Sequence, residues 1–377
     1  MQSIQGRNPA NGENIEVIVD DGFIQSILPA ASGEDRWLSP GFIDLQINGY
    51  CGYDLNAESL TPDVVIALAQ RLVALGITTF LPTLITAAEE QLVAALRAIA
   101  AARDLSPLAA HMIPCVHVEG PHLSPTDGPR GAHPRAHVRP PDCDELERWQ
   151  AASGGLVGLV TLSPHWDDAL DYIAYATRRG ILVALGHTDA DPARIHAAAE
   201  AGARLSTHLG NGVAGELPRH PNLLWAQLAD DRLTATFIAD GHHLPPDTLT
   251  AMLRAKGIER SILVSDAVAI GGLQPGVYET PVGGTVELTA EGRIGIPGTG
   301  ILAGAALPLR DGVANVARLP GFSLQQAVQM ATENPGRILG GRGALRIGAP
   351  ADLVQFTWSP DGGDLEIGRV FICGVEQ

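Results

Sequence analysis

The sequence predicts an α/β protein: a (β/α)8 TIM-like barrel with a small β-sandwich domain formed by the N- and C-terminal segments. Three observations lead to this prediction. From Pro40 onward, short apolar runs alternate with amphipathic stretches of helical period. The two ends of the chain instead show strand-like runs separated by turn residues. Polar side chains suited to metal chemistry follow several of the apolar runs.

Strands that are apolar throughout and alternate with helices are typical of a parallel sheet covered by helices. The eight strand candidates are Phe42–Ile47, Ile77–Pro82, Met112–Val118, Val157–Leu162, Ile181–Gly186, Arg204–Thr207, Leu233–Ala239 and Ser261–Ser265. The helix candidates among and after them are Pro62–Leu75, Ala87–Arg103, Asp167–Arg179, Asp191–Ala201, Pro246–Lys256, Gly304–Arg318 and Ser323–Glu333. Thr61 and Asp191 each precede a proline, as an N-cap precedes proline at the first helical position. We therefore assign residues 40–341 to the barrel.

The terminal segments predict β-structure. Ile15–Leu28 contains two short strands around Asp21–Gly22, and Asp-Gly is a strong hairpin signal. Ala351–Thr357 and Leu365–Gly374 are also strand-like. We expect residues 1–39 and 342–377 to pair into one small β domain. A glycine-rich stretch, Gly271–Gly300, follows the last barrel strand and predicts an insertion at the barrel rim.

Composition excludes several classes of protein. With 377 residues, 45% of them hydrophobic, the chain can bury a large core. A net charge of −17 argues against nucleic acid and anionic membranes as partners. No apolar stretch approaches the length of about 18 residues that a membrane span requires, and Met1–Asn8 lacks a signal-peptide pattern, so a cytoplasmic location is expected. The four cysteines include no CxxC pair and are expected to be reduced and structural, not disulfides or a thiolate metal site.

Glu119, His187 and His208 follow the third, fifth and sixth strand candidates. In a parallel barrel these ends form the rim where active sites are built. One glutamate with two histidines is an accepted zinc ligand set, and zinc lowers the pKa of its bound water to about 7. Alone, a rim histidine is more often structural, and Glu119 before Gly120 could cap a loop. The three together favour a metal site.

Asp266 follows the eighth strand candidate. An aspartate there is often an N-cap or ion-pair partner, but beside a metal it can act as general base and acid. On the first strand, Gln46 and Asn48 point the same way, where many barrel hydrolases carry a His-x-His pair for a second metal. Amides are poor zinc ligands, so one divalent ion is predicted: Zn²⁺ by default, although Fe²⁺ and Co²⁺ accept the same ligands.

Several short motifs occur in a characteristic order along nearly the whole chain. They are Pro40–Asp44, His117–Pro121, Gly186–Thr188, Thr207–Leu209, Ile238–Gly241, Ser265–Ala267, Leu302–Gly304 and Ala349–Leu353. With these motifs the sequence resembles the N-acetylglucosamine-6-phosphate deacetylases of the amidohydrolase superfamily. Gln46 and Asn48 resemble the single-metal branch of that family.

The resemblance implies a homodimeric, metal-dependent enzyme of amino-sugar metabolism that releases acetate and glucosamine 6-phosphate from N-acetylglucosamine 6-phosphate. It implies metal binding by Glu119, His187 and His208. It implies proton transfer by Asp266 and polarisation of the acetyl carbonyl by His133. Further implied substrate contacts are Ala132, Asn211, Gly212, Leu302, Ala303 and Gly304, with His243 and Arg219 on the phosphate. In the family this arginine reaches into the neighbouring subunit's site.

Two alternatives remain open. An amidohydrolase acting on an unphosphorylated N-acyl amine or N-acyl amino acid would give Arg219 and His243 no phosphate role, and Arg219 alone suggests a surface residue. The second alternative is a catalytically inactive barrel that serves as a scaffold. The missing His-x-His pair favours it, and the presence of Glu119, His187, His208 and Asp266 together argues against it. The stretch Ser124–Arg130 and Gly210 depart from the family pattern and affect sugar binding more than the chemistry. The remaining loop histidines, expected to be mostly solvated, are His111, His117, His122, His165, His196, His220 and His242.

Overall fold

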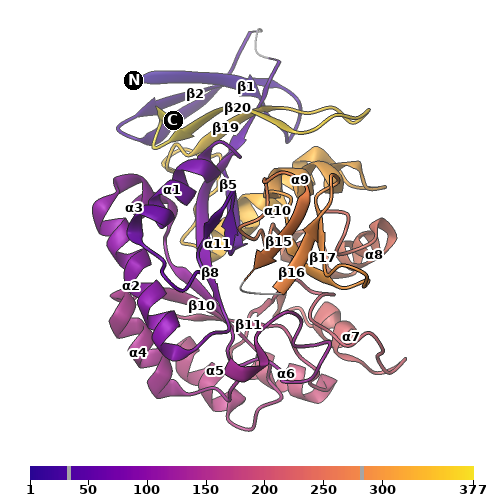
Figure 1. Ribbon diagram of the computed structural model, residues 1–377. Coiled ribbons are helices and arrows are strands. Elements are labelled where there is room, and N and C mark those ends of the chain that lie inside the picture. Colours follow the sequence, from indigo (N-terminus) through magenta and orange to yellow (C-terminus); the bar gives the residue numbers. More distant parts are fainter. Residues whose placement is uncertain (32–34, 281–283) are drawn as a thin grey trace.

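The computed structural model describes residues 1–31, 35–280 and 284–377. Within these ranges it contains an eight-stranded parallel sheet rolled into a nearly closed barrel, together with three other sheets. Both chain termini lie in a sheet at one end of the barrel, at the top of Figure 1.

The barrel strands confirm the predicted (β/α)8 fold, and each neighbouring pair in the sheet is parallel. They are β5 (Phe42–Ile47), β8 (Ile77–Ile85), β9 (Val116–Glu119), β10 (Val157–Leu162), β11 (Leu182–Leu185), β12 (Leu205–Ser206), β13 (Thr234–Ile238) and β14 (Ser261–Val264). The first and last strands meet where the Asp266 amide donates to the Gln46 carbonyl at 2.9 Å and Ile47 bridges to Ala267. This contact brings the end of the last strand beside the end of the first.

Helices surround the barrel on its outer side in Figure 1. They are α1 (Pro62–Val73), α2 (Glu89–Leu105), α3 (Pro107–Met112), α4 (Cys143–Ser153), α5 (Ala169–Arg178), α6 (Pro192–Ala201), α7 (Leu223–Ala229), α8 (Pro246–Lys256), α9 (Leu309–Arg318), α10 (Leu324–Ala331) and α11 (Glu333–Ile338). Four of these helices, α3, α4, α7 and α11, were not predicted from the sequence. Met112 was predicted to begin a strand, whereas it ends α3. The Asp191 side chain caps α6 by accepting from the Arg194 amide, but Thr61 makes no such bond to α1.

The barrel interior is filled by side chains and is not a channel. Ile43, Leu81, Leu159 and Val264 belong to one buried cluster that occupies it. A larger cluster lies between the strands and the surrounding helices. Ligand chemistry is therefore confined to the rim, where the strands end.

The two termini form one seven-stranded sheet, here called the terminal sheet. Its strands, in spatial order, are β21 (Val375–Glu376), β20 (Glu366–Ile372), β19 (Leu353–Thr357), β4 (Trp37–Pro40), β1 (Gln2–Arg7), β2 (Asn14–Asp20) and β3 (Phe23–Pro29). Asp21 (φ 48°) and Gly22 (φ 78°) make the predicted left-handed turn. Val17 and Phe371 meet in one buried cluster although their strands lie in different halves of the sheet. The predicted sandwich is thus one continuous sheet that folds around its own core.

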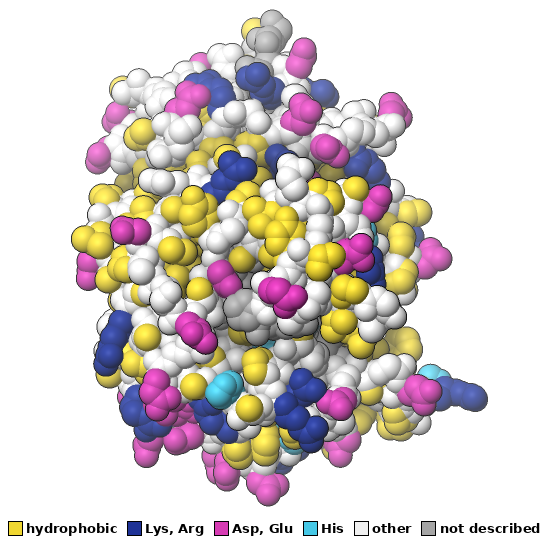
Figure 2. Space-filling model, in the orientation of Figure 1, with side chains coloured by type: hydrophobic (Ala, Val, Ile, Leu, Met, Phe, Trp, Pro, Cys, Tyr) yellow, Lys and Arg dark blue, Asp and Glu magenta, His cyan; other side chains and the backbone are white. Residues whose placement is uncertain are grey.

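A four-stranded antiparallel sheet beside the barrel mouth confirms the predicted insertion. Its strands are β15 (Gly276–Thr280), β16 (Gly284–Leu288), β17 (Arg293–Gly295) and β18 (Leu302–Ala305); residues 281–283 lie outside the described residues. On the face shown in Figure 2, basic side chains are scattered among acidic ones. Among the described residues, no helix combines the length and apolar character needed to span a bilayer.

Candidate active site

The three predicted metal ligands converge at the barrel rim. Nε2 of His208 lies 3.0 Å from Glu119 Oε1 and 3.1 Å from Nε2 of His187, which is 3.4 Å from the same Glu119 oxygen. Tetrahedral zinc with bonds of about 2.1 Å spaces its ligand atoms about 3.4 Å apart. The three donor atoms therefore have the spacing of one face of a zinc coordination tetrahedron.

The hydrogen-bonding pattern of these side chains also fits a cation. Nδ1 of His187 lies 2.9 Å from the Pro129 carbonyl oxygen, and because a carbonyl only accepts, this nitrogen carries the imidazole proton. When the imidazole is neutral, the Nε2 lone pair of His187 then faces the carboxylate oxygen of Glu119. Two electron-rich atoms held together in a buried site repel each other unless a positive charge lies between them. The residues fit a divalent ion.

A second combination of residues also has metal-ligand character. Glu119, His133 and His187 each offer a donor atom within 4.8 Å of the others. Nδ1 of His133, however, is paired with the Thr86 hydroxyl at 2.9 Å. Nε2 of His208 contacts both other predicted ligands at 3.0–3.1 Å. The predicted set with His208 is therefore the tighter one.

The backbone at these residues is strained. His187 (φ 47°), His208 (φ 28°) and Asp266 (φ 53°) are three of the six described non-glycine residues in the left-handed region. Such conformations persist only where the surrounding structure enforces them, and they gather at functional sites. Two glycines leave room for the His187 imidazole. A Cβ at Gly212 would lie 2.7 Å from its Nδ1, and one at Gly131 would lie 3.1 Å from its Cε1, so a side chain at either position would crowd the ring.

Asp266 is held at the cavity by the first strand. Its Oδ1 accepts a 2.7 Å hydrogen bond from the Asn48 side chain. Burial and the charge of Glu119 raise the pKa of Asp266 to about 6. Below it, the buried Asp44 carboxylate accepts from the Ser265 amide at 3.2 Å, which ties the first strand to the last. Asn48 is thus a partner of Asp266, while Gln46 is buried and does not line the cavity.

The electrostatics of Glu119 and His133 differ. When no cation is present, burial acts to raise the pKa of Glu119, but hydrogen bonds and charge from His187 and His208 hold it well below its ordinary value. For His133, burial and the neighbouring His187 lower the pKa to about 3, so its imidazole is neutral. The site therefore combines an ionised carboxylate among the candidate ligands with a neutral histidine beside them.

The catalytic cavity has a volume of about 410 Å³. Its walls include most of the predicted site residues: Asn48, Glu119, Ala132, His133, His187, His208, Asn211, Gly212, His243, Asp266, Leu302, Ala303 and Gly304. Arg219 and Gln46 are the exceptions: Arg219 is exposed, Gln46 is buried, and neither lines this cavity. Asp54 and Asn56 line it without having been predicted. They lie before α1, and no apolar run precedes them to mark a strand end.

A family model described as the amidohydrolase family matches residues 37–376, which is most of the chain. This chain belongs to the amidohydrolase family. The predicted superfamily is therefore confirmed.

Named relatives of this amidohydrolase are similar over most of their length. N-acetylglucosamine-6-phosphate deacetylase of Bacillus subtilis (strain 168) is 35% identical over 327 residues, or 85% of this chain and 80% of the relative. N-acetylgalactosamine-6-phosphate deacetylase of Escherichia coli O157:H7 is 32% identical over 363 residues, or 94% and 93%. A mutant N-acetyl-D-glucosamine-6-phosphate deacetylase from Mycobacterium smegmatis, in complex with N-acetyl-D-glucosamine-6-phosphate, is 28% identical with a TM-score of 0.87, covering 100% and 99% of the chains.

His243 of this amidohydrolase is oriented by a buried carboxylate. Its Nδ1 lies 2.7 Å from Asp240 Oδ2, and the amides of His242 and His243 both donate to Oδ1 of that aspartate. Although burial acts to raise the pKa of Asp240, these bonds and the charge of His243 hold it below its ordinary value. Nδ1 of His243 therefore donates to Asp240, which leaves Nε2 as the ring nitrogen available to a ligand in the cavity.

Two other histidines of this amidohydrolase differ from the sequence expectation. His122 and His117 are buried, not solvated. His122 stacks on Trp149 with ring centroids 5.6 Å apart, and His117 Nε2 lies 2.8 Å from the Thr161 hydroxyl inside the barrel. Burial lowers the pKa of each to about 4, so both are neutral packing residues.

Proposed function

We propose that the chain hydrolyses the acetamide of N-acetylglucosamine 6-phosphate, giving glucosamine 6-phosphate and acetate. The observation that carries the proposal is the convergence of Glu119, His187 and His208 beside Asp266 in a cavity of about 410 Å³. The named relatives, and the substrate in the complex of one of them, support the choice of substrate.

One divalent ion is proposed at this site, with Zn²⁺ the default and Fe²⁺ or Co²⁺ compatible with the same ligands. Glu119, His187 and His208 would hold it through the three donor atoms that lie 3.0–3.4 Å apart. Such an ion lowers the pKa of bound water to about 7 and polarises a carbonyl group. Gln46 and Asn48 add no imidazole at the first strand, which supports a single ion.

Asp266 is proposed as the group that moves the proton. Its carboxylate accepts a proton from the attacking water, whose oxygen bonds to the acetyl carbon. The C–N bond then breaks, and Asp266 returns the proton to the departing amine nitrogen. Burial beside Glu119 raises its pKa to about 6, which suits a group that accepts and then releases a proton near neutral pH.

His133 is proposed to stabilise the negative charge that develops on the acetyl oxygen. The Thr86 hydroxyl lies 2.9 Å from Nδ1 of His133, and when that hydroxyl donates, the imidazole proton resides on Nε2. A neutral Nε2–H then serves as donor to the oxyanion, and one such donor is typically worth about 2.7–4 kcal/mol. Ala132, Asn211, Gly212 and Leu302–Gly304 would surround the sugar.

His243 is proposed to bind the phosphate within the cavity, and Arg219 to bind it from a second subunit. Arg219 is exposed and absent from the wall of its own cavity, which supports a role in a neighbouring site. The two groups would supply local positive charge in a chain of net charge −17. A homodimer follows from this assignment.

The alternative substrate class is an unphosphorylated N-acyl amine or N-acyl amino acid. Measuring kcat/KM on N-acetylglucosamine with and without the 6-phosphate separates the two classes. Each charged hydrogen bond contributes about 1.5–3 kcal/mol, so loss of the phosphate is expected to lower kcat/KM by about 100-fold or more. Equal rates on both compounds would favour the alternative. N-acetylgalactosamine 6-phosphate belongs in the same assay, because a relative carries that name.

We also propose that residues 1–39 and 342–377 form a small β domain and that residues 40–341 form the hydrolase barrel. The separate buried cluster of the terminal sheet supports this division. A cytoplasmic location and the absence of a nucleic-acid partner stay predictions. The four cysteines are free, as is usual in a reducing compartment.

A further inference from the structure

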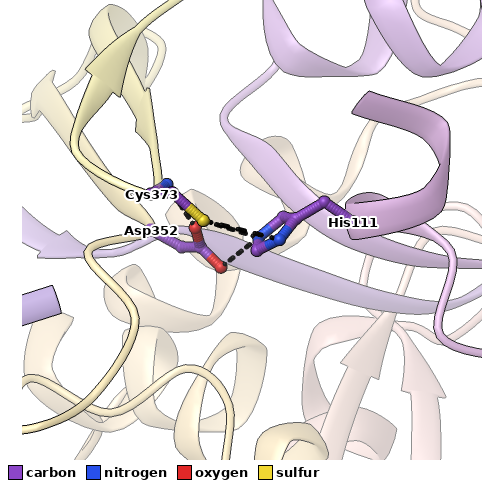
Figure 3. Close-up of side chains that lie close together, drawn as sticks. All are labelled: His111, Asp352 and Cys373. Atoms are coloured by element: carbon purple, nitrogen blue, oxygen red, sulfur yellow. Dashed lines mark hydrogen bonds and ion pairs between the residues drawn. The ribbon is translucent and has the colours of Figure 1, made fainter. Parts of the chain in front are cut away.

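A second group of metal-ligand side chains lies where the terminal sheet meets the barrel (Figure 3). His111 belongs to the last turn of α3, Asp352 precedes β19, and Cys373 lies between β20 and β21. His111 precedes the other two residues by more than 200 positions in the sequence. Their side chains point toward one another in Figure 3. We call them the junction cluster.

The geometry of the junction cluster is compact. Asp352 Oδ2 lies 2.8 Å from Nε2 of His111. The Cys373 sulfur lies 3.5 Å from Nδ1 and 3.9 Å from Nε2 of the same ring. One donor atom from each residue falls within 4.8 Å of the others. The three donor atoms are therefore close enough together to share a single ion.

The backbone holds these side chains in place. The Cys373 amide donates to Asp352 Oδ1 at 2.9 Å, which fixes the carboxylate and turns Oδ2 toward His111. Cys373 itself has φ 49°, a strained value for a non-glycine residue. Arg342 donates to the His111 carbonyl at 2.8 Å and so fixes the end of α3. Side-chain exposure is 22% for His111 and 8% for Asp352.

We propose that the junction cluster binds a divalent cation of the zinc class through His111 Nε2, Asp352 Oδ2 and Cys373 Sγ. Imidazole, carboxylate and thiolate are the three ligand types that zinc accepts, at bond lengths of about 2.0–2.3 Å. A thiolate and a carboxylate together carry the charge that a divalent cation neutralises. The ion would join a barrel helix to the terminal sheet.

Other roles for the cluster fit less well. A Cys–His nucleophile pair needs the sulfur at one ring nitrogen and an adjoining cavity for substrate. Here the sulfur is nearly equidistant from both ring nitrogens, and the catalytic cavity includes none of the three residues. Burial and the Asp352 carboxylate raise the pKa of the Cys373 thiol, and the charge of Arg342 opposes them in part. A bound cation favours the thiolate, so binding releases a proton and strengthens as pH rises. The expectation that all four cysteines are only structural would then fail at Cys373.

Cobalt spectroscopy tests this site independently of the catalytic one. Co²⁺ bound to a thiolate gives a sulfur-to-metal charge-transfer band in the near ultraviolet, and Glu119, His187 and His208 offer no sulfur. Titration of the full chain with Co²⁺ is expected to produce this band and to saturate it at one thiolate-bound ion per chain. Cys373→Ser and His111→Gln are expected to lose the band. Cys143→Ser, at a half-buried cysteine on α4, is the matched control and should keep it.

The result that overturns the proposal is a folded wild-type chain, saturated with Co²⁺, that lacks the band. A band that persists in Cys373→Ser also overturns it. A second measurement covers the case in which a variant folds poorly. Zn²⁺ is expected to raise the thermal midpoint more for Cys143→Ser than for His111→Gln, and equal shifts would contradict the proposal. Deacetylase activity serves only as a check of folding, so failure of the proposed function leaves this test intact.

Discussion

The Asn48 side chain donates a 2.7 Å hydrogen bond to Oδ1 of Asp266. The two residues are separated by 218 positions in the sequence and meet because the barrel closes between its first and last strands. Asn48 occupies a position where many barrel hydrolases place a histidine for a second metal. In this chain the position instead supports the proposed proton carrier.

Replacing Asn48 with alanine is expected to move the acid limb of the kcat/KM profile to higher pH. The amide stabilises the ionised carboxylate, so its loss raises the pKa of Asp266. A hydrogen bond to a charged group contributes about 1.5–3 kcal/mol, which corresponds to a shift of about one to two pH units. Asn48→Asp, which adds a second carboxylate, should move the limb further. An acid limb that stays in place in both variants would remove Asn48 from this role.

Asp266→Asn is expected to reduce kcat by about 100-fold to 10,000-fold, the usual contribution of a positioned acid-base group. Its metal content should equal that of the unmodified chain, since Asp266 is not among the three proposed ligands. Glu119→Gln is the companion variant and is expected to lose metal as well as activity. Near-normal turnover of Asp266→Asn would show that another group carries the proton.

Thr86→Val is expected to lower kcat by about 10-fold with little change in KM. The side chains have similar shape, but valine removes the hydroxyl that pairs with Nδ1 of His133, a bond worth about 1 kcal/mol or slightly more. Thr86→Ser keeps the hydroxyl and is the matched control. If Ser and Val variants have the same kcat, the hydroxyl does not set the His133 tautomer.

Arg219→Ala is expected to raise KM for the phosphorylated substrate at least 10-fold and to change kcat little, because its charge binds phosphate and not the acetyl group. Mixing Arg219→Ala chains with Asp266→Asn chains tests whether this arginine acts in the site of the neighbouring subunit. A hybrid dimer would contain one site with both Asp266 and the partner's arginine, so activity at low substrate should reappear. Mixtures no more active than the separate variants would contradict a shared site.

Most of the fold could be predicted from the sequence because the patterns that indicate strands, helices and turns are local. Apolar runs at Phe42–Ile47 and Val157–Leu162 match β5 and β10 residue for residue. Glu119, His187, His208 and Asp266 follow four other apolar runs of the same kind. A polar residue at the end of such a run marks the end of a strand, so these four could be placed at the rim. The Asp21–Gly22 turn was predictable for the same reason, since its left-handed backbone suits those two residues.

Features that depend on contacts between distant segments could not be predicted. His122 is buried between Trp149 and Tyr172, and no local pattern around it indicates that packing. Asp44 contacts Ser265 only because the barrel closes. The junction cluster likewise combines α3 with residues more than 200 positions later. Periodicity identifies strands and helices, but it does not reveal which loops meet.

Acetate release from N-acetylglucosamine 6-phosphate, measured before and after metal removal, tests whether hydrolysis depends on the proposed ion. In the Cys373→Ser variant only the catalytic ion should remain to be counted. Chelation is expected to abolish acetate release, and about one equivalent of Zn²⁺ per chain should restore it; Glu119→Gln in the same background should not recover. Full activity in a folded, metal-free chain would contradict the proposal that Glu119, His187 and His208 hold an ion essential for hydrolysis.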